Sequence, residues 1–149
     1  MSLATPIERM DDRMDAIAQS LSGALSTRII KRSLLPYTDH SAQEIAAGVV
    51  TVISAGEGNY NKGLGLVARD GHQSVLLIGH LKLAEGEPGQ AIEAAELDLI
   101  EEIKAWVRAP GIEGLSLRLD HVQHSRQLDN PFGWIVAALE AGPPRSTVR

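Results

Sequence analysis

The strands predicted from this sequence carry apolar residues on both faces, and no other feature constrains the fold as strongly. A strand with one face in water alternates apolar and polar residues, because successive side chains point to opposite sides of the sheet. In three stretches, residues 49–53, 76–78 and 134–139, apolar residues instead occupy both positions of that alternation. Each face of the sheet therefore needs a cover.

Two long amphipathic helices are predicted to supply part of that cover. Apolar residues recur at helical spacing over residues 6–24, with Thr5 as the expected N-cap and Pro6 as the first helical residue. A second helix is expected from Pro88 to about Arg108. In a chain of 149 residues, two helices cover one sheet face fully and the other partly. We expect a neighbouring subunit to cover the remainder, since large exposed apolar patches mark interfaces. The alternative is two sheets packed on each other within the chain.

The remaining signals complete an α+β fold. Ser41 is expected to cap a short helical turn through Ala47, and Asp70-Gly71 favours a hairpin between the strands on either side of it. The expected strands are residues 28–34, 48–55, 63–69, 72–83, 115–124 and 133–140. The sequence thus predicts a mixed, mainly antiparallel sheet of about five or six strands with two main helices packed on it. This single domain spans residues 1–141, and a flexible C-terminal tail occupies 142–149.

Composition excludes some classes of function. A net charge of −5 argues against general nucleic-acid binding, which depends on clustered Lys and Arg side chains. The lack of cysteine removes disulfides, thiolate nucleophiles and Cys-ligated zinc. Charged residues interrupt the first 18 residues, and no apolar run reaches the 18 residues of a membrane helix. We therefore expect neither a standard export signal nor a membrane span, and we expect no cofactor.

Glu96 is the residue most out of place in the second predicted helix. It lies between Ile103 and Val107 within the apolar stripe, where a lone buried carboxylate is costly. Its carboxylate is therefore expected to pair with a cation or to accept hydrogen bonds from a backbone amide. A catalytic acid is the alternative, because perturbed carboxylates occur at active sites.

Candidate chemistry elsewhere in the chain is sparse. Ser125 closely follows His121 and His124, but no G-x-S-x-G nucleophile motif is present. We expect His121 to continue the apolar row 115–119 as a hydrogen-bonded core residue. The five histidines show neither H-x-H nor H-E-x-x-H spacing, so no metal site is expected. The glycine-rich stretch 56–63 fits neither phosphate-binding motif and is expected to be a mobile loop.

The order of these features resembles one family. In chain order they are Gly48-Val49-Val50-Thr51-Val52, Gly56-Glu57, Gly71-His72, Leu77-Ile78-Gly79, and the acidic helix with Glu101-Glu102-Ile103. The most specific stretch is Ser-x-Gln-x-x-x-Pro-x-Gly-Trp at residues 125–134. Over residues 5–141 the chain resembles the tail terminator proteins of long-tailed bacteriophages, of the lambda minor tail protein U type, and related Mu-like prophage proteins.

This resemblance implies a structural protein rather than an enzyme. It implies an α+β subunit that forms a hexameric ring on the end of the finished tail tube, stops polymerisation of the tube and offers a surface for joining the head. The implied partners are copies of the chain, the tail tube protein and a head–tail connector protein, with no specific nucleic acid and no membrane. The implied location is the virion tail, and the cytoplasm of the bacterial host during assembly.

Assembly contacts are expected on the glycine-rich loop and on the acidic helix. The expected contact residues are Tyr60, Lys62, Glu93, Glu101 and Glu102. The acidic residues would line a channel that DNA crosses without binding, or would form an ordinary solvated face. Six further residues are expected to have structural roles in or beside the family stretch: Glu96, Ser125, Gln127, Pro131, Gly133 and Trp134.

Two other functions remain open from the sequence. One is a small hydrolase-type enzyme that uses Glu96 or Ser125 with a nearby histidine. The other is a neck or adaptor binding module of a phage-derived tube. A solvent-open pocket that holds Glu96 beside a histidine would favour the enzyme. A Glu96 sealed in the core beside an arginine or a backbone amide would argue against it.

Overall fold

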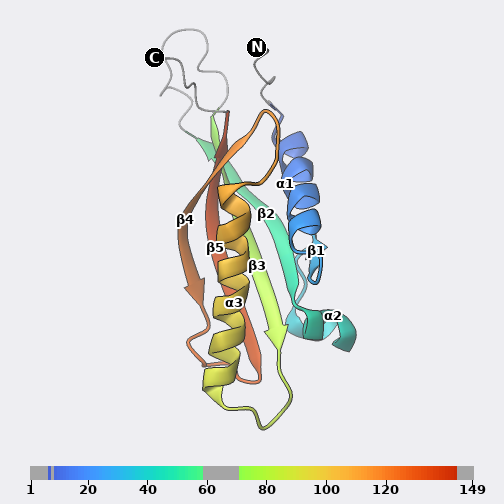
Figure 1. Ribbon diagram of the computed structural model, residues 1–149. Helices are drawn as coiled ribbons and strands as arrows, with labels where there is room; N and C mark the ends of the chain where they lie inside the picture. The colour runs from blue at the N-terminus through green and yellow to red at the C-terminus, as the bar shows by residue number, and fades with distance from the viewer. Residues whose placement is uncertain (1–6, 8, 59–70, 144–149) are drawn as a thin grey trace.

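A five-stranded mixed sheet forms the centre of the computed structural model, which describes residues 7, 9–58 and 71–143 (Figure 1). The strand order is β1-β2-β3-β5-β4. Within the described residues, β1 pairs with β2 in parallel, and the other three neighbouring pairs are antiparallel. The strands are β1 (Ile29–Lys31), β2 (Val49–Gly58), β3 (His72–Lys82), β4 (Ser116–His124) and β5 (Phe132–Gly142). The predicted fold class is confirmed.

Two long helices, α1 (Met10–Ala24) and α3 (Gly89–Arg108), pack on one face of this sheet. Figure 1 shows α3 crossing in front of β3 and β5, with α1 beside β2. The layer between helices and sheet is the hydrophobic core, and its fully buried side chains include Ile17, Leu21, Leu77, Ile103 and Ile135. Because the described strands form one sheet, the alternative of two sheets packed on each other is wrong.

The helix boundaries follow the capping signals at two of the three α-helices. Ser41 caps the short α2 (Ala42–Ala47) through a capping box, in which its side chain accepts from the backbone of Glu44 while the Glu44 carboxylate accepts from Ser41. Pro88 precedes α3 as predicted. The helix α1, however, begins at Met10 rather than at residue 6. The backbone N–H of Ile7 donates to the carbonyl of Gly114 at 2.9 Å, which holds this residue outside the helix; Thr5 and Pro6 lie outside the described residues.

The hairpin predicted at Asp70-Gly71 cannot be compared with the structure, because Asp70 and its expected first strand, residues 63–69, lie outside the described residues. Its expected second strand is present as β3. Within the described residues, β3 lies between β2 and β5 and is antiparallel to both, with Gly58 of β2 opposite His72. A local turn signal carries no information about which distant strand competes for the same edge.

The C-terminal strand runs slightly beyond the predicted domain boundary at residue 141. Gly142 still belongs to β5 and pairs with Ser116 of β4. The Ser116 hydroxyl also donates to the Pro143 carbonyl at 3.1 Å. The rest of the predicted tail, residues 144–149, lies outside the described residues.

The sheet face opposite the long helices is only partly covered. Alternate residues of β3 face away from α3, because Gly79 lies directly against Leu99 of that helix. We call five adjoining, partly exposed side chains on this second side the open face: Ile53, Leu76, Ile78, Val136 and Ala138. At one end, the segment with the 3₁₀ turn η1 (Tyr37–Asp39) and α2 covers the sheet, and Val49 there is fully buried. The described chain therefore leaves an apolar strip of its own sheet incompletely covered.

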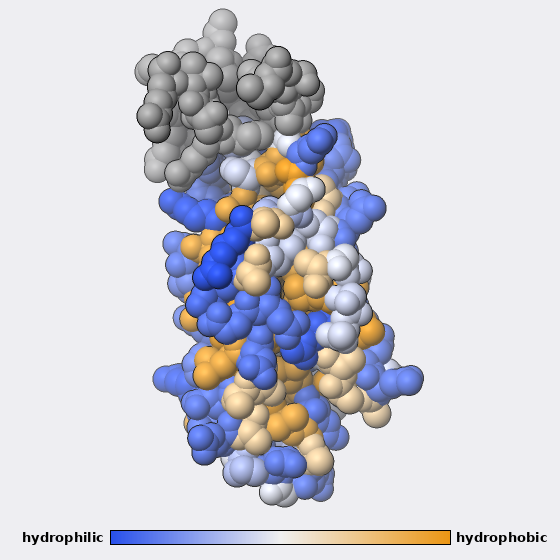
Figure 2. All heavy atoms as spheres, in the orientation of Figure 1, coloured by the Kyte–Doolittle hydropathy of each residue, from blue (hydrophilic) through white to orange (hydrophobic). Residues whose placement is uncertain are grey.

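The helix-covered side has a different surface. Figure 2 shows this side in the orientation of Figure 1: hydrophilic residues make up much of it, and the hydrophobic atoms form small, separated areas. A mixture of this kind is ordinary on the surface of a folded protein. The open face differs because its apolar side chains come from three neighbouring strands and adjoin one another.

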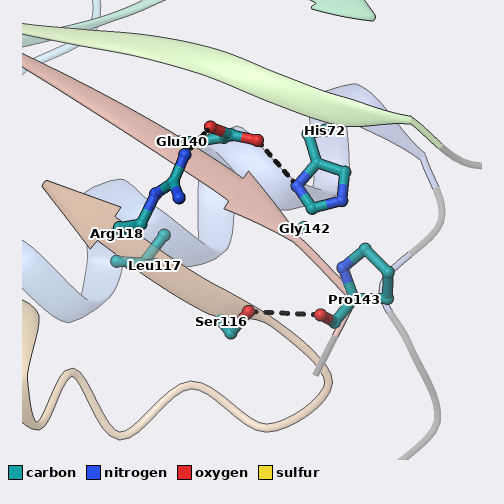
Figure 3. A pocket seen from close by; sticks show the side chains of 7 residues that line it. All are labelled: His72, Ser116, Leu117, Arg118, Glu140, Gly142 and Pro143. Atoms are coloured by element: carbon teal, nitrogen blue, oxygen red, sulfur yellow. Dashed lines mark hydrogen bonds and ion pairs between the residues drawn. The ribbon is translucent and has the colours of Figure 1, made fainter. Parts of the chain in front are cut away.

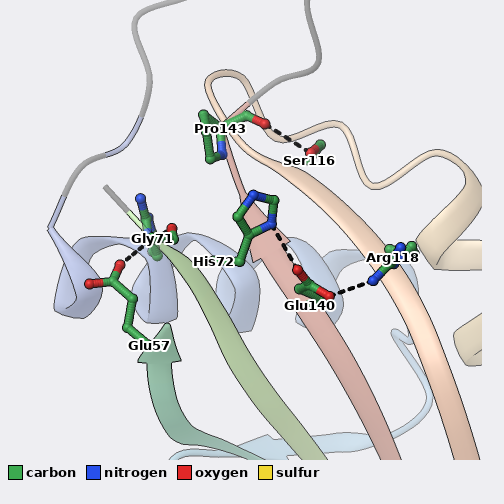
Figure 4. Close-up of polar contacts among 8 residues, drawn as sticks. Glu57, Gly71, His72, Ser116, Arg118, Glu140 and Pro143 are labelled. Atoms are coloured by element: carbon green, nitrogen blue, oxygen red, sulfur yellow. Dashed lines mark hydrogen bonds and ion pairs between the residues drawn. The ribbon is translucent and has the colours of Figure 1, made fainter. Parts of the chain in front are cut away.

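Arg13 holds α1 to the ends of β2 and β3. Its guanidinium is fully buried; Nη1 lies 2.6 Å from Glu57 Oε2 and donates to the Gly71 carbonyl at 3.2 Å, while Nε donates to the Ile7 carbonyl at 2.7 Å. Figure 4 shows Glu57 and Gly71 at the adjoining ends of the two strands. One arginine thus fixes the N-terminal helix and both sides of the connection between β2 and β3.

Candidate functional site

Glu96 is the centre of a buried polar network between α3 and the β4–β5 connection. Its side chain is fully buried, and Oε2 accepts hydrogen bonds from the Ser125 hydroxyl at 2.5 Å and from the Trp134 backbone N–H at 2.8 Å. Oε1 lies 3.5 Å from Nδ1 of His124. The expectation that this carboxylate needs hydrogen-bond partners is confirmed, and a backbone amide is one of them.

A β-bulge at Asp120 explains how His124 reaches Glu96. Leu119 pairs with Leu139 and His121 with Ala138, so Asp120 is an extra residue in β4. Before the bulge, odd-numbered residues of β4 face the helices; after it, even-numbered residues do, and His124 is one of them. The prediction that His121 is a core residue is wrong, because its side chain is 59% exposed. The switch of the apolar row from Leu119 to Val122 is the sequence signal that could have revealed the bulge.

Gly133 allows α3 to approach β5 at this point. A Cβ on Gly133 would lie 2.7 Å from Glu96 Oε2 and 2.7 Å from Ile92 Cγ1, closer than carbon side chains tolerate. The neighbouring Trp134 N–H can therefore reach Glu96 only because residue 133 has no side chain.

Replacing Gly133 by alanine is expected to destabilise the protein by about 2 kcal/mol, because either Glu96 or α3 must move. The matched control is Gly23→Ala in α1, where nothing lies within 4 Å of the added methyl group and alanine is the better helix former. The free energy of unfolding in urea should fall for the first variant and rise slightly for the second. Equal stability of the two variants would contradict the packing described here.

The loop between β4 and β5 is held at both ends by side-chain hydrogen bonds. The Trp134 indole N–H donates to Asp129 at 2.9 Å, and the Asn130 amide donates to the Glu87 carbonyl at 3.1 Å. Pro131, which follows a cis peptide bond, accepts at its carbonyl from the Leu83 N–H at 2.9 Å. Residues 129–131 thus form the entry to β5.

Gln127 lies in the exposed part of this loop. Arg126 and Gln127 both adopt left-handed backbone conformations, with φ of 57° and 65°. The Gln127 side chain lies against Gly89 and donates to Glu93 at 3.4 Å. It therefore joins the loop to the first turns of α3.

The geometry gives Ser125 no access to a substrate. Its hydroxyl is fully buried and already donates to Glu96. A nucleophilic serine needs an open position beside a base and room for an acyl group. A hollow of the surface beside them is lined by His124 and Trp134, and its lining includes neither Ser125 nor Glu96. Glu96 and Ser125 are placed to orient the β4–β5 loop.

Three of the five predicted contact residues, Glu93, Glu101 and Glu102, lie on α3. Tyr60 and Lys62 lie outside the described residues. On α3, Glu102 forms an ion pair of 2.5 Å with Arg28, and Glu101 forms one of 2.9 Å with Lys104. These pairs neutralise part of the acidic face that the sequence suggested as a channel lining. Among the side-chain hydrogen bonds of the described residues, Glu93 takes part only in the one that it accepts from Gln127.

A second polar cluster, absent from the sequence predictions, lies on the same side as the open face. Glu140 of β5 accepts from Arg118 of β4 at 2.5 Å and lies 2.9 Å from Nδ1 of His72 on β3 (Figure 3). Figure 4 shows the three side chains in one row across the strands. They line a hollow of about 440 Å³ whose other walls are Ser116, Leu117, Gly142 and Pro143. Three strands distant in sequence supply the charges, so local spacing gives no sign of them.

Neither a metal centre nor a membrane helix is evident in the described part of the chain. No three His, Asp or Glu side chains among residues 7, 9–58 and 71–143 converge as metal ligands would. The helices of these residues are too short or too polar to cross a lipid bilayer. Comparison with protein-family models gives no match, and comparison with curated proteins gives no relative.

Proposed function

We propose that this chain is a structural virion protein that caps the end of a phage tail tube, stops its polymerisation and provides the surface for joining the head. One physical observation carries the proposal: the open face leaves adjoining apolar side chains of three strands partly exposed. Such a strip marks a contact with another protein surface. The resemblance of residues 125–134 to the tail terminator family is the reason for proposing that this contact is made in a phage tail.

A ring needs two unlike surfaces on each subunit. A head-to-tail contact closes when its rotation allows, and each subunit then buries one surface against a different surface of its neighbour. The open face is the apolar surface of such a contact. The row of His72, Glu140 and Arg118 adjoins it and would supply the polar rim that interfaces carry around an apolar centre. We propose a hexamer, with the tail tube protein and a head–tail connector protein as partners.

Electron microscopy tests this function directly. The purified chain should be imaged alone and mixed with tail tubes built from the tube protein of the same gene cluster. The expected result is a six-fold ring on one end of each tube and no further growth when tube protein is added. Bare tube ends that keep growing, with a monomer at every concentration, would contradict the proposal. Binding to the connector without binding to tubes would favour the neck adaptor instead.

Leu76→Asp is expected to abolish the ring while it leaves the subunit folded. A carboxylate in the middle of the open face must lose its water on assembly, and this desolvation lowers the affinity of one subunit for the next. In the free subunit this side chain is only partly exposed, so the variant should also lose about 1–3 kcal/mol of stability, which leaves the subunit folded. The control is Ala105→Asp on the exposed side of α3. Sedimentation and micrographs should show rings for the control only; rings in both variants would place the contact elsewhere.

A further inference from the structure

Residues 34–47 form a cover over one end of the sheet side that carries the open face. The Tyr37 ring lies 4.6 Å from the His80 ring of β3 and 5.1 Å from the Phe132 ring of β5, measured between centroids. Ile45 of α2 is 3% exposed. A largely apolar hollow of about 360 Å³ remains between this segment and β3, lined by Leu34, Leu35, Pro36, Tyr37, Ile78 and His80. The cover and the open face thus meet at Ile78.

Three nitrogen-bearing side chains join this cover to the sheet in one chain of contacts. Lys31 Nζ lies 3.5 Å from His40 Nδ1, and His40 Nε2 lies 3.3 Å from His80 Nδ1. An ammonium has only donors, so His40 Nδ1 accepts and the proton of His40 is on Nε2. That proton is then donated to His80 Nδ1. The chain Lys31–His40–His80 therefore requires both imidazoles to be neutral.

The charged groups around this pair do not favour a second positive charge. Lys31 of β1 faces His40, and its ammonium is also 3.1 Å from Glu44 of α2, which it neutralises. On the β3 side, the Lys82 ammonium lies over the Phe132 ring at 5.2 Å.

Negative groups near the cover act on Tyr37. Burial, and then the charges of Asp129 and Glu96, raise the pKa of Tyr37 to about 12, so this phenol stays neutral. The nearest ion to the two imidazoles is thus a cation.

Protonation breaks the chain of contacts at both junctions. A proton on His80 Nδ1 would face the N–H of His40 across 3.3 Å, and a proton on His40 Nδ1 would face the Lys31 ammonium. Burial, and then the charge of His40, lower the pKa of His80 below its usual 6.5. The unfolded chain therefore takes up the His80 proton at a higher pH than the folded chain. The stability that neutral His80 contributes is present above pH 6.5 and is lost as the pH falls below it.

We propose that residues 34–47 are an acid-released latch: protonation of His80 breaks its contact with His40, which detaches this segment from the sheet and extends the apolar open face toward Val49. The latch is a property of the single subunit and does not depend on the proposed role in a phage tail. Both imidazoles are at least nine-tenths buried, with 6% exposure for His40 and 8% for His80, so a proton on His80 can be solvated only when the segment moves.

Hydrogen exchange of the folded chain, followed by mass spectrometry at about pH 7.5 and about pH 5, tests the latch across the titration range of histidine. After correction for the chemical exchange rate, peptides over residues 37–47 should lose protection by about tenfold or more at the lower pH. Peptides from β3 and β5 should keep theirs. His80→Phe keeps an aromatic ring beside Tyr37 but cannot titrate, and its segment 37–47 should show no such loss.

Two further variants make the result decisive. His40→Gln places an amide opposite His80, and this amide can donate to a neutral His80 Nδ1 or accept from a protonated one, so the variant should show no pH-dependent loss, as His80→Phe does. His121→Phe alters an exposed histidine on the same side of the sheet, and it should behave as the unchanged chain does. Unchanged protection of residues 37–47 at both pH values would overturn the latch. So would a loss that persists in His80→Phe and His40→Gln, or a loss shared by every element.

Discussion

Replacing Arg13 by methionine is expected to lower the free energy of unfolding by about 3–5 kcal/mol. The variant removes the cation but leaves Glu57, whose side chain is 11% exposed, without a partner at 2.6 Å. It also leaves the carbonyl groups of Ile7 and Gly71 without their donor. A buried carboxylate cannot recover this loss from solvent, whereas methionine retains most of the volume of the arginine stem.

Urea denaturation measured by circular dichroism checks this prediction, with Arg9→Met as the matched control. Arg9 also forms an arginine–carboxylate pair, with Asp11 at 3.0 Å, but both side chains are more than half exposed. Its loss should cost no more than about 1 kcal/mol. The double variant Arg13→Met/Glu57→Leu should recover part of the stability, because no buried charge remains. A cost for Arg13→Met as small as that of the control would mean that the arginine does not hold the strand ends.

Replacing Glu96 by alanine is expected to destabilise the protein by about 3 kcal/mol. The Ser125 hydroxyl and the Trp134 N–H would lose their acceptor, and the side chains around the fully buried Glu96 would face a cavity. The β4–β5 loop should also become less ordered, because Ser125 begins that loop. Hydrogen exchange in residues 125–134 should therefore rise more than exchange in the core strands.

Two control substitutions distinguish the effect of losing the hydrogen bonds of Glu96 from the effect of losing any acidic side chain on α3. Glu96→Gln keeps one oxygen that can accept from either donor, and it should cost clearly less than alanine. Glu93→Ala removes a carboxylate one turn away, whose hydrogen bond to Gln127 is exposed, and it should change stability by no more than about 0.5 kcal/mol. If Glu96→Ala unfolds at the same urea concentration as Glu93→Ala, the network does not stabilise the loop.

The local signals in the sequence predicted most of the elements. Ser41 and Glu44 are three residues apart, so their capping box depends on nothing beyond one helical turn. The predicted bounds of α3 hold because the proline and the apolar stripe lie within the element that they define. The start of α1 was predicted wrongly, since a hydrogen bond from Ile7 to the distant Gly114 competes with the first turn.

The candidate site was predicted only in part, for the same reason. Glu96 is conspicuous in the sequence because a helical wheel places it among apolar residues. Its donors are not conspicuous: Ser125 and Trp134 lie 29 and 38 residues away. The bulge at Asp120, the row of His72, Glu140 and Arg118, and the contact between His40 and His80 all join residues of different strands or segments.

By itself, the sequence determined that strands with apolar residues on both faces would be present and that one carboxylate of the second long helix would need buried partners. Both conclusions follow from periodicity, which is a property of neighbouring residues. Only the tertiary structure decided that β5 inserts between β3 and β4, that both long helices lie on one side, and that the apolar strip on the other side is left partly exposed. The order of strands depends on competition between distant segments for the same edge, and no local pattern encodes its outcome.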